Sequence, residues 1–547
     1  MIYQVFSLLS FLILLSIMFC CKASNPASTS RPHIIFVLFD DQGYNEVNWV
    51  NQNENRYIMP TLDLLSKEGV TFASNYYAGS ICSPSRAMFM TGRYSTRLGL
   101  QANVVWNNIP WAVSQEEEFL PQILSKHGGY TSYGAGKYHL GMMSEWALPT
   151  SRGFDMWDGF LQGCGSEWTH VASCCEAGSS FDDKEYVCPN VYDQDFRGYD
   201  WFKNDKPDFS ANGTKTSEQI VLSTKQFLRL HASKFESTDD MSPIFLFLSF
   251  QNIHNPVTTK EEFYNMYKDQ EKFNEDEKVM YAYLTEADAA VGAIKDELDK
   301  LGYLDKSVIF YSSDNGAEPT ENVNLRNYPL RGYKYETWDG GNMVPGLVWT
   351  NMESLIPDER RGAKSHELYH ITDLKPTMMR LAGINPGVLD QSLPLDGYDV
   401  WDSIAFGYSS PRQEMLYNIN PLCDRGDALT PKAAIRVGDM KLVCWCFNVT
   451  GIDGANETGP VPNPEDSQGS WPMLFNLKDD PYETTNIADD NQDIVDDLVN
   501  RLKKYADEMV IPMEFDPPFQ GKDYYCADCP FRPETGPYEP WGPWIHD

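Results

Sequence analysis

The sequence predicts an α/β protein with a mostly parallel sheet covered by helices and a smaller α/β domain at its C-terminal end. Apolar residues form continuous runs of strand length at His33–Phe39, Ile244–Phe250 and Ser307–Ser313. Such runs are typical of parallel strands that are buried on both faces. Stretches with helical spacing separate the runs, and polar residues follow each run directly. This alternation indicates a parallel sheet with its functional site beyond the carboxyl ends of the strands.

Length and charge limit the possible functions. The chain has 547 residues and is 42% hydrophobic, so it can bury a large core, and we expect more than one domain. Its net charge of -34 argues against nucleic-acid binding. An anionic substrate would have to be drawn in by a local basic pocket, because the overall field repels it.

The N-terminal segment predicts entry into the secretory pathway. A short apolar run at Phe6–Phe19 is followed by small residues, which predicts a signal peptide over residues 1–24. A signal anchor is the alternative, which the shortness of the run disfavours, and no later stretch is long and apolar enough to span a membrane. Glycosylation acceptors begin at Asn212, Asn448 and Asn456. We therefore expect a secreted or lysosomal glycoprotein without stable membrane insertion.

The cysteines fit an oxidising compartment. Of 12 cysteines, two are removed with the signal peptide, and Cys82 is considered separately below. The other nine fall into two regions, as disulfide staples would, and their odd number leaves at least one without an intramolecular partner. They are Cys164, Cys174, Cys175, Cys188, Cys423, Cys444, Cys446, Cys526 and Cys529. The last two have zinc-ligand spacing, but no second ligand pair lies near them, so a disulfide is the better prediction.

The elements between the buried strands can be predicted in chain order. Helical spacing is found at Pro60–Glu68, Phe119–His127, Ser217–Leu230 and Glu275–Leu301. A strand from Tyr130 runs into a glycine-containing loop with Lys137 and His139, and another strand is expected near Val344–Trp349. Lys137 and His139 are two residues apart, so they face the same way if the backbone is extended.

The chain is expected to divide near residue 405. Residues 25–405 form the predicted catalytic domain, and residues 406–547 are richer in cysteine, proline and acidic residues. Within this second part, Ala433–Val443 reads as a hairpin with a Gly-Asp turn, and a helix is expected from Asp493 to Met509. No internal repeat is visible. These elements predict a smaller C-terminal α/β domain.

The segment Cys82–Arg86, with the sequence CSPSR, is a candidate anion site. Pro84 fits the first turn of a helix, so Cys82 is expected just before a helix N-terminus, where backbone N–H groups favour negative charge. Arg86 falls one turn further on. On its own, a cysteine in a secreted chain is more often half of a disulfide or a small buried side chain.

Oxygen donors at the strand ends are candidate metal ligands. Asp40 and Asp41 follow the first strand, and Asp314 and Asn315 follow the third. Such residues often cap helices or lie in solvated turns. Grouped at one sheet edge, however, they favour Ca²⁺ or Mg²⁺ over zinc.

Several segments resemble the type I, formylglycine-dependent sulfatases. Cys82–Arg86 followed by Thr91–Arg93 resembles the first signature of that family. Gly136–Gly141 resembles the second signature, with Tyr138 where the family has tryptophan, and Arg152–Asp155 matches a further segment. The resemblance covers nearly all of residues 31 to 510.

Within the family, the sequence is most similar to arylsulfatase B-type enzymes, which act on N-acetylgalactosamine 4-sulfate. The segments that carry this likeness are Pro329–Lys334, Tyr369–Asp373 and Leu395–Trp401. Asp339 departs from the usual glutamate before Gly-Gly, and we expect it to be structural.

The resemblance implies an alkaline-phosphatase-like fold and a modified nucleophile. Cys82 would be oxidised before folding to Cα-formylglycine by the formylglycine-generating enzyme. One hydroxyl of the aldehyde hydrate would attack the sulfate sulfur, and the other would later expel sulfate by C–O cleavage. One Ca²⁺ would be held by Asp40, Asp41, Asp314, Asn315 and residue 82.

The resemblance also implies roles for the remaining polar residues. Arg86, Lys137 and Lys334 would bind the sulfate and the formylglycine hydrate. Asp314 would take the proton of the attacking hydroxyl. His254 would protonate the leaving alkoxide, and His139 would deprotonate the second hydroxyl when sulfate is expelled.

Two other functions are alternatives to a sulfatase acting on a sulfated carbohydrate or a small sulfate ester. A phosphatase or phosphodiesterase of the same superfold needs ligands for a second metal, and the chain has only nine histidines, two of them already assigned. A catalytically inactive binding protein would be favoured by the loss of Cys82, Arg86 or an acidic ligand, and none is lost. Among sulfatases, other sulfated metabolites stay open as substrates.

Overall fold

The computed structural model describes most of the chain between residues 31 and 513. The described ranges are 31–50, 56–106, 111–172, 198–238, 241–320, 322–323, 326–421, 432–444, 471–510 and 512–513. The predicted signal peptide, the acceptors Asn448 and Asn456, and seven of the nine cysteines lie outside these ranges. In the described part, Cys444 is a buried free thiol. No helix among the described residues is both long and apolar enough to cross a membrane.

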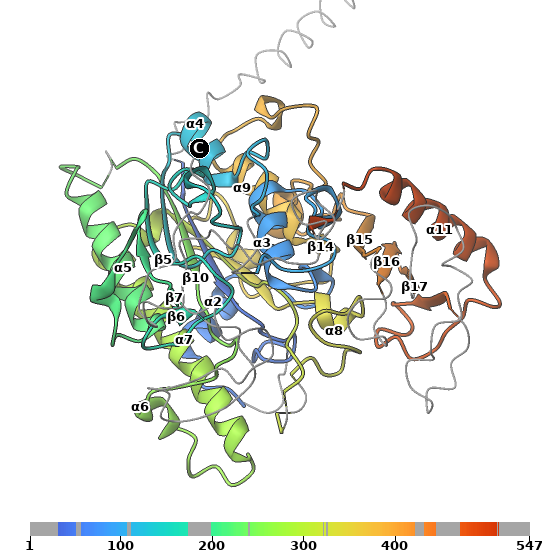
Figure 1. Cartoon of the computed structure of the whole chain (residues 1–547), viewed down its shortest axis with the longest axis horizontal. Coiled ribbons are helices and arrows are strands. Elements are labelled where there is room, and N and C mark those ends of the chain that lie inside the picture. The colour runs from blue at the N-terminus through green and yellow to red at the C-terminus, as the bar shows by residue number, and fades with distance from the viewer. Residues whose placement is uncertain are drawn as a thin grey trace, which may run out of the picture. The chain divides into compact units, whose positions relative to one another are not determined.

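A ten-stranded sheet forms the centre of the structure (Figure 1). Its order is β13-β2-β12-β11-β1-β10-β4-β5-β8-β9. The five central strands are parallel, and they are β11 (Ser307–Ser313), β1 (His33–Phe39), β10 (Ile244–Ser249), β4 (Thr131–Lys137) and β5 (Met156–Phe160). The flanking strands are β12 (Gly346–Thr350), β2 (Val70–Phe72), β13 (Lys364–Ser365), β8 (Phe202–Lys203) and β9 (Lys206–Pro207). The three predicted apolar runs are thus adjacent in the sheet.

Helices cover both faces of this sheet, because alternate side chains of each central strand face opposite ways. In β1, Phe36 packs into one hydrophobic core and Val37 into another. The first core includes side chains of α3 (Cys82–Thr91), α4 (Leu120–Gly128) and α9 (Leu374–Leu381). The second includes side chains of α2 (Pro60–Glu68), α5 (Thr216–Ala232) and α7 (Glu275–Lys300). The predicted mostly parallel sheet with covering helices is confirmed.

A smaller antiparallel sheet follows the large one in the chain. Its strands, in order, are β15 (Glu414–Ile419), β16 (Ala433–Val437), β17 (Met440–Cys444) and β18 (Met473–Asn476). The predicted hairpin is β16 and β17, and Gly438 in its turn takes the positive φ of 57° that suits glycine. Leu498 and Leu502 of α11 (Gln492–Asp507) pack in one hydrophobic core with β16 and β17 side chains.

Shorter elements complete the described part of the chain. They are β3 (Tyr76–Tyr77), β6 (Val171–Ala172), β7 (Gly198–Tyr199), β14 (Tyr369–His370), α6 (Glu261–Tyr264), α8 (Asp339–Asn342) and α10 (Trp401–Phe406), besides several single 3-10 turns. The element α8 begins at Asp339, shortly after the segment Pro329–Lys334.

A buried ion-pair network joins α8 to β17. The Lys441 ammonium lies 2.7 Å from Asp339 Oδ1 and 2.6 Å from Glu483 Oε1. Tyr417 donates a hydrogen bond to the same Asp339 oxygen, and the Asp339 amide donates to Glu483 Oε2. Burial raises the pKa of Glu483 to about 7 even beside Lys441. These contacts give Asp339 a structural role, as expected from the sequence.

Replacing Lys441 with methionine should destabilise the fold strongly. The substitution leaves two buried carboxylates without their shared cation, and breaking a buried ion pair in this way costs about 3–5 kcal/mol. Urea unfolding should show a clear fall in the transition midpoint. Lys478→Met, at an exposed lysine that follows β18, is the matched control and should change stability by less than about 0.5 kcal/mol. Equal midpoints for the two variants would contradict a stabilising role of the network.

Candidate active site

The acidic residues of the site come from the carboxyl ends of adjacent parallel strands. Asp40 and Asp41 follow β1, and Asp314 follows β11, its neighbour in the sheet. The backbone of Asp41 is left-handed, with φ of 59°, and its amide donates a 3.1 Å hydrogen bond to Asp314 Oδ1. The amide of Asp40 donates to the carbonyl of Asn252, beyond the end of β10. The parallel registers therefore bring the three carboxylates together, as the sequence predicted.

The helix α3 presents Cys82 at its buried first turn. The sequence placed Cys82 just before the helix, but α3 begins at Cys82 itself, with Ile81 as its N-cap. The Ser83 hydroxyl accepts the amide of Val105, and the Ser85 hydroxyl accepts the amide of Gly79. These bonds fix two neighbouring loops to the first turn.

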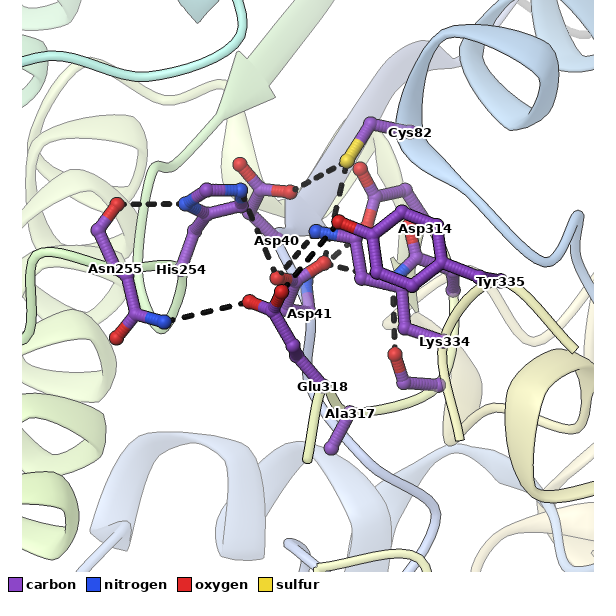
Figure 2. Close-up of polar contacts among 12 residues, drawn as sticks. Asp40, Asp41, Cys82, His254, Asn255, Asp314, Ala317, Glu318, Lys334 and Tyr335 are labelled. Atoms are coloured by element: carbon purple, nitrogen blue, oxygen red, sulfur yellow. Dashed lines mark hydrogen bonds and ion pairs between the residues drawn. The ribbon is translucent and has the colours of Figure 1, made fainter. Parts of the chain in front are cut away.

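The Cys82 side chain faces the acidic strand ends (Figure 2). Its Sγ lies 3.5 Å from Asp40 Oδ1 and 3.9 Å from Asp41 Oδ1. Burial raises the pKa of the Cys82 thiol well above its usual value, and the charges of Lys137 and Lys334 offset this only in part. A thiol in this setting stays protonated, so it is a poor nucleophile in its unmodified form.

Three predicted cations each pair with one of the three aspartates. Arg86 Nη2 lies 2.7 Å from Asp314 Oδ2, Lys137 Nζ lies 2.6 Å from Asp40 Oδ2, and Lys334 Nζ lies 2.7 Å from Asp41 Oδ2. All six side chains are buried. Arg86 also donates to the Lys137 carbonyl and to the Ser249 hydroxyl, which ties α3 to β4 and β10. Three positive and three negative charges are thus concentrated in one water-poor site.

The aspartates differ in basicity. Burial raises the pKa of Asp41, but the charges of Lys334, His254 and Lys137 outweigh burial and hold this pKa below its usual value. Burial and the charge of Asp40 raise the pKa of Asp314 to about 6, against the effect of Arg86. Asp314 is therefore the better proton acceptor of the two.

His254 lies beside the acidic cluster and is more accessible than the aspartates. Its Nε2 is 3.7 Å from Asp41 Oδ2, and its side chain is 13% exposed. The other ring nitrogen lies 2.6 Å from the Asn255 carbonyl oxygen. Burial, and then the charge of Lys334, lower the pKa of His254 to about 4.

His139 is oriented differently from the sequence expectation. Its backbone is left-handed, with φ of 58°, so the extended geometry that would place it on the same side as Lys137 is wrong. Its Nε2 lies 3.1 Å from the Val105 carbonyl oxygen rather than against an ion pair. Burial, followed by the charge of Lys137, lowers the pKa of His139 well below its usual value. The ring is therefore neutral. Val105 connects it to the Cys82 segment, because the Val105 carbonyl contacts His139 and the Val105 amide donates to Ser83.

A group of ligand atoms suited to a metal ion lies at the centre of the site. Asp40, Asp41, Cys82 and His254 each offer one atom, and these atoms are within 4.8 Å of one another. Asn315 adjoins the group, because its Nδ2 donates a 2.7 Å hydrogen bond to Asp41 Oδ1. Its Oδ1 is buried and accepts no hydrogen bond within the described part of the chain. Of the predicted metal ligands, Asp314 accepts two hydrogen bonds from Arg86, whose Nη2 also lies 3.6 Å from Asp40 Oδ1.

Sequence reasoning missed three residues beside the site. Asn255, Glu318 and Tyr335 are connected by hydrogen bonds next to His254 and Lys334 (Figure 2). Asn255 and Tyr335 directly follow predicted residues, which is the only signal that the sequence offers for them. Glu318 has no such signal.

This sheet, with acidic residues at its strand ends and a buried helix N-terminus beside them, has the alkaline-phosphatase-like architecture. The sequence profile of a protein family described as Sulfatase matches residues 32–384, which is more than half of the chain, and the chain belongs to this family. The members of this family are enzymes that hydrolyse sulfate esters.

Named relatives agree with the family assignment. Arylsulfatase J from Mus musculus is 32% identical over 549 residues, which covers 95% of this chain and 81% of that protein. N-acetylgalactosamine-6-sulfatase from Mus musculus is 27% identical over 510 residues and covers 88% of this chain and 87% of that protein. These relatives support the sulfatase family that the motifs predicted, without selecting the arylsulfatase B subtype.

A solved structure agrees with the fold. The crystal structure of Ps i-CgsB matches with a TM-score of 0.68 and 24% sequence identity, and covers 88% of this chain and 94% of that one. At this identity the match concerns the fold, and it confirms the predicted alkaline-phosphatase-like architecture.

Proposed function

We propose that the protein cleaves sulfate monoesters with a Cα-formylglycine at position 82 and one bound Ca²⁺. The observation that carries the proposal is the position of Cys82, at a helix N-terminus and within 3.5 Å of Asp40, surrounded by three buried cations. Sulfuryl transfer, like phosphoryl transfer, depends mainly on positioning and charge stabilisation. A concentrated set of fixed charges meets this need.

The residues at the strand ends fit a calcium ion. Asp40, Asp41, Asp314, Asn315 and the oxygen of the modified residue 82 would hold it. They supply oxygen donors, which Ca²⁺ prefers, and the buried, unpaired Oδ1 of Asn315 is a ligand atom without another partner among the described residues. When bound, the ion supplies positive charge that stabilises the sulfate oxygens. Since the three cations and three aspartates balance, the divalent ion would make this site cationic inside an acidic protein.

The chain's own side chains would bind the substrate and move the protons. The formylglycine hydrate supplies the attacking hydroxyl. Arg86, Lys137 and Lys334 hold the sulfate and the hydrate in place and stabilise negative charge. The raised pKa of Asp314 suits it to accept the proton of the attacking hydroxyl.

The two histidines would act on the remaining protons. His254 is the more accessible of the two, and we assign it to protonate the leaving alkoxide. Its pKa is lowered to about 4, so the negative charge of the bound sulfate ester would have to raise this pKa before the ring could carry the proton. His139 is held neutral by burial, and a neutral imidazole can take the proton of the second hydroxyl as sulfate is expelled.

A sulfated carbohydrate is the proposed natural substrate. The motif likeness to arylsulfatase B-type enzymes favours N-acetylgalactosamine 4-sulfate. One relative is named for a sulfated N-acetylgalactosamine, and Ps i-CgsB is described in complex with a neocarrahexaose. Another small sulfate ester is the alternative substrate.

We propose maturation in the secretory pathway. The predicted signal peptide over residues 1–24 would direct the chain there, and the formylglycine-generating enzyme would modify Cys82 before folding. The acceptor Asn212 is exposed, so glycosylation there is compatible with the fold. Secretion and delivery to the lysosome are the two alternative destinations of this route. The division into residues 25–405 and 406–547 also stays a prediction.

Paired esters test the proposed reaction against the phosphatase alternative. Wild type should hydrolyse 4-nitrophenyl sulfate with a higher kcat/KM than 4-nitrophenyl phosphate. The phosphate carries about two charges near neutral pH because its second pKa is about 6, whereas the sulfate carries one. A preference for the phosphate would contradict the assignment.

Replacing Lys334 with alanine should reduce kcat on the sulfate by about 10²–10³-fold, with a smaller change in KM. The reason is that negative charge grows near this ammonium as the ester bond breaks. Steady-state kinetics measures both constants. Lys300→Ala, at the exposed end of α7, is the matched control and should keep wild-type kinetics. Full kcat in Lys334→Ala would remove Lys334 from the proposed mechanism.

A further inference from the structure

Tyr335 presents an aromatic ring beside the site in an unusual backbone conformation. Its φ of 76° is left-handed, a conformation that bulky residues rarely adopt. The fold holds it there, since the Tyr335 amide donates a 2.7 Å hydrogen bond to the Ser80 carbonyl. The residue is 50% exposed, and its ring centroid lies 5.3 Å from Lys334 Nζ. An apolar surface is therefore fixed next to a sulfate-binding cation.

Glu318 links this ring to the loop of His254. Tyr335 Oη donates to Glu318 Oε1 over 3.4 Å, and Asn255 Nδ2 donates to Glu318 Oε2 over 3.3 Å (Figure 2). The Asn255 carbonyl oxygen contacts His254 Nδ1. We call Asn255, Glu318 and Tyr335 the mouth triad. It joins three loops, which follow β10 and β11 and precede α8.

The charge of Glu318 differs from that of the aspartates in the site. Each aspartate is neutralised by a lysine or arginine within 2.7 Å, whereas no such ion pair is found for Glu318 within the described ranges. Its carboxylate is partly exposed and keeps lone pairs for further hydrogen bonds. A group with these properties accepts hydroxyl or amide hydrogens and repels a nearby anion.

Resting on the proposed function, we infer that the mouth triad binds the alcohol part of the ester and selects a sugar ring that carries no second anionic group. The triad adjoins His254, which protonates the leaving oxygen, so it lies on the leaving-group side. The Tyr335 ring offers a flat surface to the apolar face of a sugar, and Glu318 accepts hydrogen bonds from sugar hydroxyls. A second sulfate or a carboxylate near the ester would meet the Glu318 charge.

Two aryl sulfates that differ in one charge test the role of Glu318. The substrates are methyl 4-(sulfooxy)benzoate, whose leaving group is neutral, and 4-(sulfooxy)benzoate, whose leaving group carries a carboxylate. Wild type should prefer the neutral ester, and Glu318→Gln should shift the ratio of kcat/KM values toward the anionic ester by about 10-fold. Comparing this ratio between wild type and the variant cancels the intrinsic difference in reactivity between the two esters.

Glu236→Gln is the matched control, because it removes the same charge from an exposed position before β10, at the opposite end of that strand from His254. It should leave the ratio unchanged. An unchanged ratio in Glu318→Gln, or an equal shift in both variants, would overturn the inference while leaving the sulfatase assignment intact. If wild type hydrolyses neither ester, the proposed function itself fails.

A sugar substrate tests the role of Tyr335. Tyr335→Asn removes the ring but keeps a residue type that tolerates a left-handed backbone. It should lower kcat/KM for N-acetylgalactosamine 4-sulfate by about 10-fold relative to 4-nitrophenyl sulfate, and Tyr335→Phe should retain most of the sugar activity. Equal losses on both substrates in Tyr335→Asn would contradict a specific contact with the sugar.

Discussion

Replacing Cys82 with alanine is expected to abolish sulfate ester hydrolysis and leave the fold intact. Without the side chain that becomes formylglycine, the site retains its charges but has no nucleophile. Loss of a nucleophile typically costs on the order of 10⁴–10⁶-fold in kcat. The side chain is small and packs with Ile81 and Val104 in a minor cluster, so its effect on stability should be small. Turnover of 4-nitrophenyl sulfate and thermal unfolding measure the two effects separately.

Cys444→Ala is the matched control for this prediction. Cys444 is also a buried free thiol, but it lies in β17 of the smaller sheet. The substitution removes the same sulfur atom, so it should cost similar stability and keep wild-type kcat. If Cys82→Ala retained more than about one hundredth of the activity, covalent catalysis at this position would be wrong.

Replacing Asp40 with asparagine is expected to remove both the metal and the activity. One carboxylate oxygen of Asp40 accepts a hydrogen bond from Lys137, and the other faces Cys82. Asp40 is also one of the residues that offer a ligand atom at the centre of the site. The neutral amide weakens the attraction to a divalent ion, and we expect kcat to fall by on the order of 10³-fold. Metal analysis of the purified protein gives a readout that does not depend on activity. Wild type should hold one calcium ion per chain, and Asp40→Asn well below one.

Asp288→Asn provides the control for the loss of a buried carboxylate. Asp288 accepts the amides of Thr61 and Leu62 at the start of α2, on the sheet face opposite α3. Its replacement should lower stability but leave the calcium content and kcat unchanged. Two metal ions per wild-type chain would instead favour the phosphatase alternative.

The fold was largely predictable because its central strands are buried on both faces. The run His33–Phe39 is apolar throughout, and this pattern has few explanations other than a central parallel strand. The grouping of several candidate site residues was predictable for a related reason. Asp40, Asp314 and His254 all follow such strands, and parallel strands end at the same edge of the sheet.

Other features depend on contacts between segments that are distant in sequence. Lys441 pairs with Asp339 about one hundred residues away, and no local pattern indicates that pairing. Glu318 is selected by its neighbours Asn255 and Tyr335 and has no motif of its own. The orientation of His139 depends on a left-handed backbone that a two-residue spacing does not reveal. Backbone turns and long-range polar contacts thus limit the prediction of site geometry from sequence.

Mass spectrometry of the Cys82 peptide tests the central claim most directly. Trypsin should release the peptide Glu68–Arg86, in which Cys82 is the only cysteine. In an active preparation from cells with the formylglycine-generating enzyme, we expect the mass of the aldehyde and its reaction with a hydrazine probe. The fraction modified should rise and fall with specific activity across preparations. A fully active preparation whose peptide contains only the thiol would contradict formylglycine catalysis.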